Sequence, residues 1–206
     1  MVCVLDQLAE DVLGGDWGGD EQDADRPAAA HCIRGADIPD LQSGGTGRMP
    51  IRYLTAASLA KRRLHDGDLV VEISGGSPTQ STGRPVLVSQ ALLGRLHLPL
   101  VCSNFCRLLR LKPHVSSKLE NLWLRALYAN DVFLQFENGT TGIKNFAYTL
   151  FSSSFKFCVP PPDIMREFDA CVAALFVRQQ VAAMEADTLA SLREALLPKL
   201  ISGELR

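Results

Sequence analysis

The sequence lacks the segments that would place a protein in a membrane or outside the cell. No apolar run approaches the ~20 residues of a bilayer-spanning helix. The stretch Met1–Asp6 has neither the basic region nor the long apolar region of a secretory signal. Without export, the six cysteines are expected to stay reduced. We therefore expect a cytoplasmic protein that does not associate with membranes.

Motifs for metals and cofactors are absent as well. Cys102 and Cys106 are the only closely spaced cysteines, and neither a Cys-x-x-Cys pair nor a Cys–His zinc spacing occurs. The segment Ser74–Gly83 is rich in glycine but contains no Gly-Lys-Ser/Thr, which excludes a phosphate-binding P-loop. We expect no metal site and no cofactor.

Enzyme motifs are missing too. Pro160–Asp163 lacks the polar residue before and the aromatic residue after that an amino-methyltransferase motif requires. Asp68 and Glu72 have the spacing of a nuclease carboxylate pair, but Ser74 stands where the usual lysine would follow. No histidine stands in a recognisable Ser/His/Asp arrangement. The chain is therefore expected to catalyse nothing, and an enzyme, as a fragment of a fused methyltransferase–specificity chain, is only the third hypothesis.

What the sequence does have is enough apolar material for a core and a strong segregation of charge. Of 206 residues, 47% are hydrophobic, which suits one domain or one domain with a long appendage. Residues 1–47 hold ten acidic and two basic residues, a net charge of −8, whereas residues 48–125 hold twelve basic and four acidic residues, a net charge of +8. A basic middle third favours a polyanion partner, although charge alone fits ordinary surface clustering equally well. We expect the acidic stretch Asp16–Asp25 to lie away from such a partner.

The first 160 residues are predicted to form a β-rich domain with one inserted helix, an α+β fold. Short apolar runs between turn residues predict strands at 69–73, 85–88, 98–102, 106–111 and 155–159. Ser117 and Glu120 fit a capping box at the start of a helix over 117–129. The face expected to pack on the strands consists of Leu119, Leu122, Trp123, Ala126 and Leu127.

The prolines at 160–162 mark a sharp boundary, after which neither glycine nor proline occurs until Pro198. Asp163 can cap a helix here, and two adjacent apolar rows predict one helix over 163–197, roughly 50 Å long. Because such a helix is longer than a small domain is wide, it needs another helix to cover it and is expected to form a coiled coil. The domains are thus 1–160 and 161–206. The predicted partner-contacting residues are Phe168, Val172, Leu175, Val181, Met184, Leu189, Leu192 and Leu196.

Two polar loops are candidates for contacting DNA. Residues 74–84 and 137–145 are rich in glycine, hydroxyls, amides and basic groups, which are the types that contact phosphates and base edges. From composition alone, plain hairpin turns are an equal alternative, since Asn138-Gly139 is a strong turn signal. The candidates for phosphate contacts are Arg48, Arg52, Lys61, Arg62 and Arg63. Those for base contacts are Thr79, Gln80, Thr82, Arg84, Lys144 and Asn145, and Ser77, Thr140 and Thr141 are further DNA-contacting candidates in the same loops.

Five stretches, in collinear order over nearly the whole chain, resemble type I restriction–modification specificity (S) subunits. The strongest is Leu192–Arg206, Leu-Arg-Glu-Ala-Leu-Leu-Pro-Lys-Leu-Ile-Ser-Gly-Glu-Leu-Arg, which closely resembles the C-terminal end of these subunits. Gly67–Gln80 and Thr141–Phe146 resemble stretches of their target recognition domains. Ala9–Gly18 and Ile33–Ile38 look like the opening of such a domain.

This resemblance implies a sequence-specific DNA-binding subunit without catalysis or cofactor. In the family, each target recognition domain binds one half of a bipartite site in double-stranded DNA. A long conserved helix acts as a spacer in an antiparallel pair and docks the methylating subunits, which restriction subunits join. We therefore expect DNA, methylating (M) subunits and restriction (R) subunits as partners.

The chain departs from the family in having one recognition domain and one long helix, where typical members carry two of each. It is interpreted as a half-subunit, natural or truncated. Our hypothesis is that two copies pair their 163–197 helices about a two-fold axis and read an inverted repeat. A complementary half-S chain or a methylating subunit is the alternative partner. The second function hypothesis is an assembly adaptor that does not bind DNA, or an anti-restriction decoy acting through the helix. The +8 segment argues against the decoy.

Overall fold

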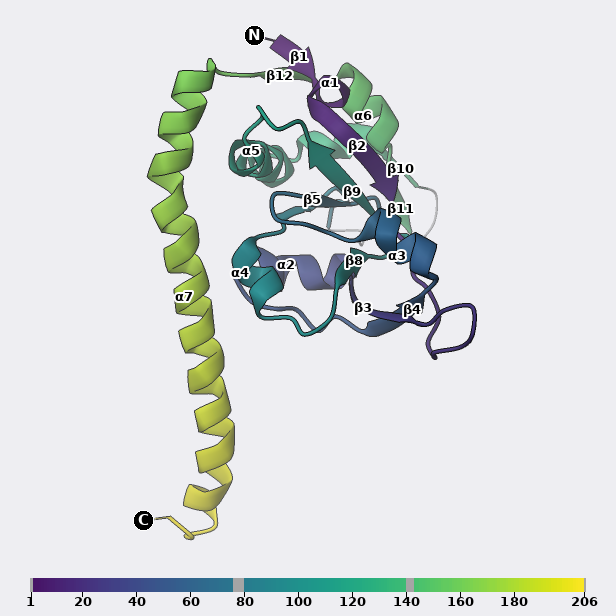
Figure 1. Cartoon of the computed structure of the whole chain (residues 1–206). Helices are drawn as coiled ribbons and strands as arrows, with labels where there is room; N and C mark the ends of the chain where they lie inside the picture. Colours follow the sequence, from purple (N-terminus) through teal and green to yellow (C-terminus); the bar gives the residue numbers. More distant parts are fainter. Residues whose placement is uncertain (1, 76–79, 140–142, 206) are drawn as a thin grey trace.

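The computed structural model describes residues 2–75, 80–139 and 143–205, and it shows a β-rich body with one long helix along its side. The helix, α7 (Pro162–Ile201), runs down the body and continues past its lower edge (Figure 1). The predicted α+β class is confirmed. No helix in the described ranges is both long and apolar enough to cross a membrane.

The centre of the body is an antiparallel sheet with strand order β2-β9-β5-β7. Its strands are β2 (Ala9–Gly14), β9 (Cys106–Leu111), β5 (Leu69–Glu72) and β7 (Pro85–Leu87). Leu69 and Val71 of β5 pack into one hydrophobic cluster, whereas Val70 packs into another on the opposite face. Because both faces are covered, β5 is a continuous apolar run rather than an alternating one.

Three smaller sheets complete the described strands. In the first, β3 (Ala28–Ile33) pairs antiparallel with β4 (Ile51–Leu54) and parallel with β8 (Leu100–Cys102). The second has the order β10-β11-β6, with β10 (Glu137–Asn138), β11 (Lys144–Phe146) and β6 (Ser74–Gly75). The third joins β1 (Val2–Val4) to β12 (Lys156–Cys158), just before α7.

Short helices cover both faces of the central sheet. One side holds α1 (Leu5–Leu8), α5 (Ser117–Ala129), α6 (Tyr148–Ser154) and the 3-10 turn η2 (Val132–Phe136). Their core is aromatic, with Phe133 edge-on to Phe151 at 5.0 Å. The other side holds η1 (Gly35–Asp37), α2 (Ile38–Gln42) and α4 (Gln90–Gly94), while α3 (Ala56–Arg62) packs on β3 and β8.

All five predicted strands and both predicted helices are present, with ends shifted by a few residues, but two details of helix α5 were wrong. Its N-cap is Ser116, whose hydroxyl accepts the Leu119 amide at 3.1 Å, so Ser117 and Glu120 form no capping box. The buried face also differs from the predicted one. Glu120, Asn121, Leu124 and Leu127 are buried, whereas Trp123 is 40% exposed. The predicted cap of α7 was wrong as well, since Pro161 occupies the N-cap position and Asp163 lies in the first turn.

The buried carboxyl group of Glu120 predicts a pH-dependent stability. Desolvation raises the pKa of Glu120 to about 7, and its Oε2 has no hydrogen-bond partner. A raised folded-state pKa gives stability that is full at low pH and lost as the pH rises through 7. Glu120→Gln should therefore stabilise the chain at pH 9 by roughly 3 kcal/mol relative to native and leave it nearly unchanged at pH 5.

Urea unfolding at both pH values measures this difference. Glu194→Gln, at an exposed position of α7, is the matched control and should change neither value. An equal effect of Glu120→Gln at the two pH values would show that Glu120 does not titrate on unfolding.

Candidate nucleic-acid interface

Four loops meet at one edge of the body because four strands end there. Strands β2 and β5 both pair antiparallel with β9, so they run in the same direction and end where β9 begins. Strands β3 and β8 are parallel and also end together. The loops that follow these strands are residues 15–17, 34–36, 73–75 and 103–105. We call this surface the four-loop face.

Backbone hydrogen bonds tie the loops to one another. The Ser103 amide donates to the Ile33 carbonyl at 2.9 Å, and the Ile73 amide donates to the Phe105 carbonyl at 2.8 Å. The Asp16 amide donates to the Cys102 carbonyl at 2.9 Å. The four loops are therefore fixed relative to one another, and together they form one ordered surface.

This face encloses an open concavity of about 660 Å³. Trp17, Arg34, Asn104, Phe105 and Gln80 contribute side chains to its wall. Its lining thus combines aromatic rings, amides and a cation in one hollow, which is typical of a binding site for a polar ligand with flat surfaces.

A buried ion pair forms the floor of the concavity. Arg84 donates from Nε and a terminal nitrogen to the two carboxylate oxygens of Glu72, both at 2.7 Å. The hydrogen bonds to Glu72 raise the pKa of Arg84. A Cβ at Gly35 would collide with the Glu72 carboxylate, and one at Gly75, whose φ is +147°, would approach it to 2.8 Å. Two of the four loops therefore need glycine to pass this close to the pair.

Arg34 presents a fixed positive charge beside the concavity. Its guanidinium donates to Asp37 at 2.9 and 3.0 Å and to the Arg48 carbonyl at 2.7 Å, and its side chain is 38% exposed. Burial by itself would raise the pKa of Asp37, but hydrogen bonds from Arg34 and from the Arg48 amide outweigh burial and lower it. The pair thus stays ionised and orients the guanidinium.

Two aromatic side chains stand at the rim and the wall. Phe105, in the turn between β8 and β9, is 51% exposed. Trp17 packs against the third hydrophobic cluster, and the Arg52 guanidinium stacks over its ring at 4.2 Å from the centroid. Arg52 also donates to the Trp17 carbonyl at 2.8 Å and pairs with Asp20. Arg52 therefore holds the 15–20 loop in place.

The structure divides the predicted loop residues into exposed and inward-facing ones. Gln80 and Asn145 are exposed, and Asn145 accepts a hydrogen bond from Ser74 at 2.7 Å. Lys144 pairs with Glu137 at 3.2 Å. Thr82 and Arg84 are buried, and the hydroxyl and amide of Thr82 both donate to Glu137. Ser77, Thr79, Thr140 and Thr141 lie outside the described residues.

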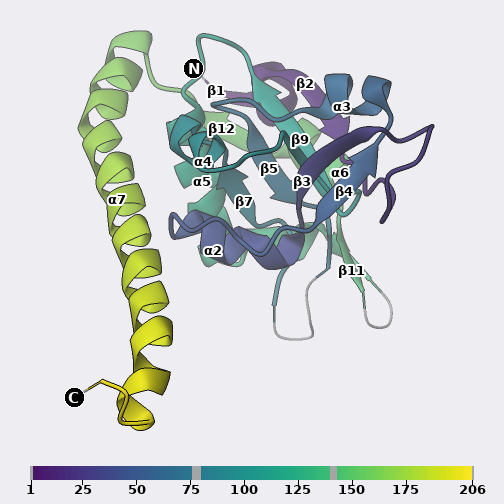
Figure 2. The ribbon, with the colours of Figure 1, turned by 60° about the horizontal axis from the view of Figure 1, so that its bottom comes forward.

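The five predicted phosphate contacts are not gathered on one face. Arg48 is exposed, and its main chain contacts Arg34 and Asp37 beside the concavity. Arg52 is buried. Lys61, Arg62 and Arg63 belong to α3 and its end, which lies at the opposite end of the body from β11 (Figure 2). A ligand seated on the four-loop face thus has Arg34 and Arg48 nearest to it.

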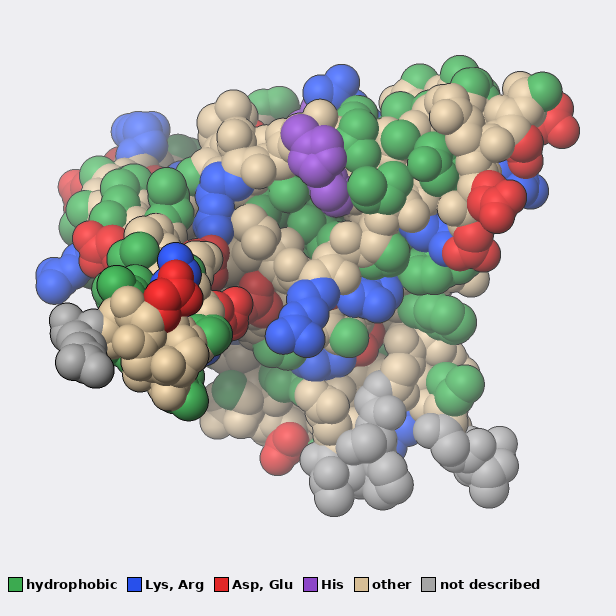
Figure 3. All heavy atoms as spheres, turned by 90° about the horizontal axis from the view of Figure 1, so that it is seen from below, with side chains coloured by type: hydrophobic (Ala, Val, Ile, Leu, Met, Phe, Trp, Pro, Cys, Tyr) green, Lys and Arg blue, Asp and Glu red, His purple; other side chains and the backbone are tan. Residues whose placement is uncertain are grey.

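Basic side chains gather on the surface seen from below. Figure 3 shows a group of Lys and Arg side chains at the centre of one face, with acidic side chains gathered toward its edge. Two acidic residues of the Asp16–Asp25 stretch are paired with arginines, Asp20 with Arg52 and Asp23 with Arg26. The centre of the face is therefore positive although the first 47 residues are acidic.

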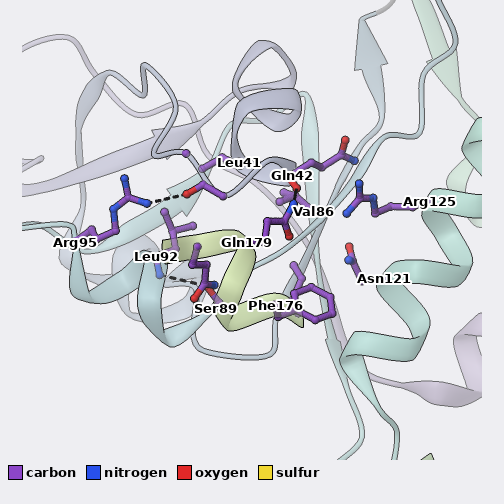
Figure 4. Close-up of a pocket in the computed structure, with 14 residues that line it drawn as sticks. Leu41, Gln42, Val86, Ser89, Leu92, Arg95, Asn121, Arg125, Phe176 and Gln179 are labelled. Carbon is purple, nitrogen blue, oxygen red and sulfur yellow. Dashed lines mark hydrogen bonds between the residues drawn. The ribbon is translucent and has the colours of Figure 1, made fainter. Parts of the chain in front are cut away.

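Helix α7 contacts the body mainly through polar groups. The Gln179 amide donates to the Gln42 carbonyl and the Gln180 amide to the Ser89 hydroxyl, both at 2.7 Å, and Arg95 pairs with Asp187 at 2.7 Å. Figure 4 shows Gln42, Ser89, Arg95 and Gln179 around a cavity of about 40 Å³. That volume holds little more than water, so this cavity is no ligand site.

The opposite face of α7 is apolar and largely uncovered. Beyond Asp187, every described residue except Ala190 is exposed. Leu189 is 65% exposed and Leu196 45%, and Val181 and Met184 are 48% and 49% exposed. Of the predicted partner-contacting residues, Leu175, Val181, Met184, Leu189, Leu192 and Leu196 are exposed, whereas Phe168 and Val172 are half-buried.

Four residues of the four-loop face were missed by the sequence-based prediction: Trp17, Arg34, Asn104 and Phe105. Each lies within three residues of the end of a strand, and a phenylalanine in the polar turn between the predicted strands 98–102 and 106–111 was a usable signal. Arg34 lies within Ile33–Ile38, a stretch noted for its resemblance but assigned no role. The sequence does not show that Arg34 pairs with Asp37, because this pair depends on the backbone turn between them.

Comparisons with known proteins show the fold. No protein-family profile and no curated protein matches the sequence. The S subunit of a type I restriction–modification system from M. genitalium matches over 98% of this chain and 46% of its own, at 15% identity and a TM-score of 0.60. A chain solved to explain complex assembly and conformational transition of the type I R-M system matches over 97% of this chain and 45% of its own, at 14% identity and a TM-score of 0.53.

The HsdS subunit from Thermoanaerobacter tengcongensis matches over 100% of this chain and 45% of its own, at 16% identity and a TM-score of 0.46. The chain spans about half the length of these structures. It therefore has the fold of about one half of an S subunit, as the sequence resemblance implies.

Proposed function

We propose that this chain is the DNA-binding half of a type I restriction–modification specificity subunit. Residues 1–160 would read one half of a bipartite site, and residues 161–206 would dock the methylating subunits, with restriction subunits joining them. The observation that carries this proposal is the likeness to S subunits over both the body and the long helix, at TM-scores of 0.60 and 0.53. The partly exposed cation Arg34 in the lining of the four-loop face supports it.

The geometry refines which residues would contact DNA. Arg34 lines the concavity and Arg48 is hydrogen-bonded to Arg34 through its main chain; both are at least partly exposed, so they are suited to phosphate or guanine contacts. Gln80 and Asn145 are exposed amides on the neighbouring small sheet and suit adenine edges. Arg52, Thr82 and Arg84 are buried with their donors engaged, and we assign them to holding the loops.

Salt dependence of DNA binding tests the location of the interface. Arg48→Ala should weaken binding to all sequences and reduce the slope of log K against log salt by about 1, because one phosphate contact is lost. Lys61→Ala removes an exposed cation of α3 that does not line the concavity, and it should change neither quantity. Fluorescence anisotropy with a labelled duplex over a salt series measures both variants. The opposite result, an effect of Lys61 alone, would place DNA on α3 instead.

The exposed apolar face of α7 supports pairing with a second copy. A two-fold axis would let the same rows of both helices cover each other in antiparallel orientation. Such a dimer would present two four-loop faces and read an inverted repeat with a fixed spacer. If α7 instead paired with a complementary half-S chain or a methylating subunit, the DNA site would not be an inverted repeat.

The direct experiment is a pull-down of the methylating subunit with this chain, followed by single-molecule sequencing of methylated genomic DNA. An inverted-repeat methylation motif would support the homodimer, and a non-palindromic bipartite motif would indicate a different half-subunit as partner. Complex formation without methylation would favour the second hypothesis, an adaptor acting through α7. A decoy is disfavoured, because residues 48–125 carry a net charge of +8 and Arg34 and Arg84 line the concavity of the four-loop face.

A further inference from the structure

The concavity of the four-loop face is large enough to receive a small flat group. Its volume of about 660 Å³ falls in the range of roughly 300–1,000 Å³ found for small-molecule sites. Base edges in a groove are read by side chains that project outward. A hollow instead suits a group that enters it.

The hollow is also rigid. The backbone bonds from Ser103 to Ile33 and from Ile73 to Phe105 fix three of its loops, and the Glu72–Arg84 pair fixes its floor. A site that is already ordered loses little conformational entropy when a ligand binds to it. Its shape is therefore a property of the fold and does not depend on a ligand to form.

The chemistry of the lining matches a nucleobase. Phe105, 51% exposed, provides an aromatic surface on which a flat ring can stack, and Trp17, whose ring already carries the Arg52 guanidinium, lines the same concavity. Asn104 is exposed and offers both a donor and an acceptor, the combination found on a base edge. Arg34, held by Asp37, supplies a cation for the phosphate of the same nucleotide.

We propose that this concavity receives a single nucleobase that has left the base stack, with Phe105 as the stacking surface. The proposal rests on the DNA-binding function proposed above and adds a nucleotide site to it. Extrusion is easiest for a base that is mismatched or unpaired. The chain should therefore prefer a duplex with an unpaired base over a fully paired one.

The test uses the full chain with Trp123→Phe, which leaves Trp17 as its only tryptophan. Three short duplexes are compared at low salt: fully paired, with one bulged adenine, and with an abasic residue at the bulge. The adenine bulge should bind about 5- to 150-fold more tightly than the abasic bulge, the range expected for one base–aromatic stack. It alone should quench the fluorescence of Trp17.

Phe105→Ala should abolish the preference for the adenine bulge over the abasic bulge. The Phe105 ring is half exposed and only its carbonyl takes part in the loop contacts, so the variant should fold. Leu150→Ala, at a similarly exposed position in α6, is the matched control and should keep the preference.

Equal affinity for the adenine and abasic bulges would overturn this proposal alone, since duplex binding would persist. Loss of the preference in Leu150→Ala as well would overturn the role of Phe105. Failure of the native chain to bind any of the three duplexes would overturn the DNA-binding function together with the nucleotide site.

Discussion

A chain with aspartate in place of both Leu189 and Leu196 is expected to sediment as a monomer at protein concentrations at which the native chain forms the proposed dimer. These leucines lie seven residues apart on the apolar face of α7, beyond the last contact of the helix with the body. The helix has 40 residues, about 60 Å. Its end, from residue 188 to 201, projects about 20 Å past Asp187 and is expected to meet its partner there.

The expected effect is large because of symmetry. In a two-fold dimer each substitution occurs twice, so four leucines are lost from the interface. Burying a leucine side chain fully is worth about 1.5–3 kcal/mol. The sum, roughly 6–12 kcal/mol, corresponds to a dissociation constant raised at least about ten-thousand-fold. Unpaired aspartates in an apolar interface weaken it further.

Sedimentation velocity over a concentration series measures the dissociation constant. Ala190→Asp with Ser191→Asp adds the same charge to the same stretch of helix but away from the Leu189–Leu196 row, and it should leave the dimer intact. If the native chain is itself a monomer at micromolar concentration, pairing with a second copy is wrong. The apolar face of α7 would then belong to a methylating subunit or to a complementary half-S chain.

The fold could be predicted from the sequence where the pattern is strong and local. The boundaries of α5 matched although its predicted buried face was wrong, and β9 matched because turn residues flank it. The strands β3, β4 and β10 were not predicted, because their segments are short and mix small, polar and charged residues. Their pairing depends on partners that are far away in the sequence, such as His31 with Leu100.

The site was predictable only in part for the same reason. Gln80 and Asn145 were found because each follows an apolar segment in a polar loop. Arg84 was expected to read bases, since the sequence does not show that strand pairing places Glu72 beside it. Lys61 and Arg48 look equivalent as basic residues, and only the fold separates them. Composition thus indicated a polyanion partner, but the distribution of the cations over the surface needed the structure.

The buried pair under the concavity gives the second large effect, on stability. Glu72→Ala is expected to destabilise the chain by about 3–5 kcal/mol, because Arg84 would remain buried without a partner. For a chain of this length the melting temperature should fall by roughly 6–20 °C. Asp187→Ala is the matched control, since Asp187 also pairs with an arginine at 2.7 Å but is 62% exposed. An exposed pair contributes about 0–1 kcal/mol, and thermal unfolding compares the two.

Removing both partners separates the stabilising role of Arg84 from a role in reading DNA. Glu72→Leu with Arg84→Met leaves no unpaired charge and should recover most of the lost stability. If Arg84 only supports the loops, the double variant should bind duplex DNA as tightly as the native chain and with the same sequence preference. Loss of preference at one base pair, with stability restored, would show instead that Arg84 leaves Glu72 to contact a base. Because the pair touches both Gly35 and Gly75, unchanged binding would also show that these loops keep their places without it.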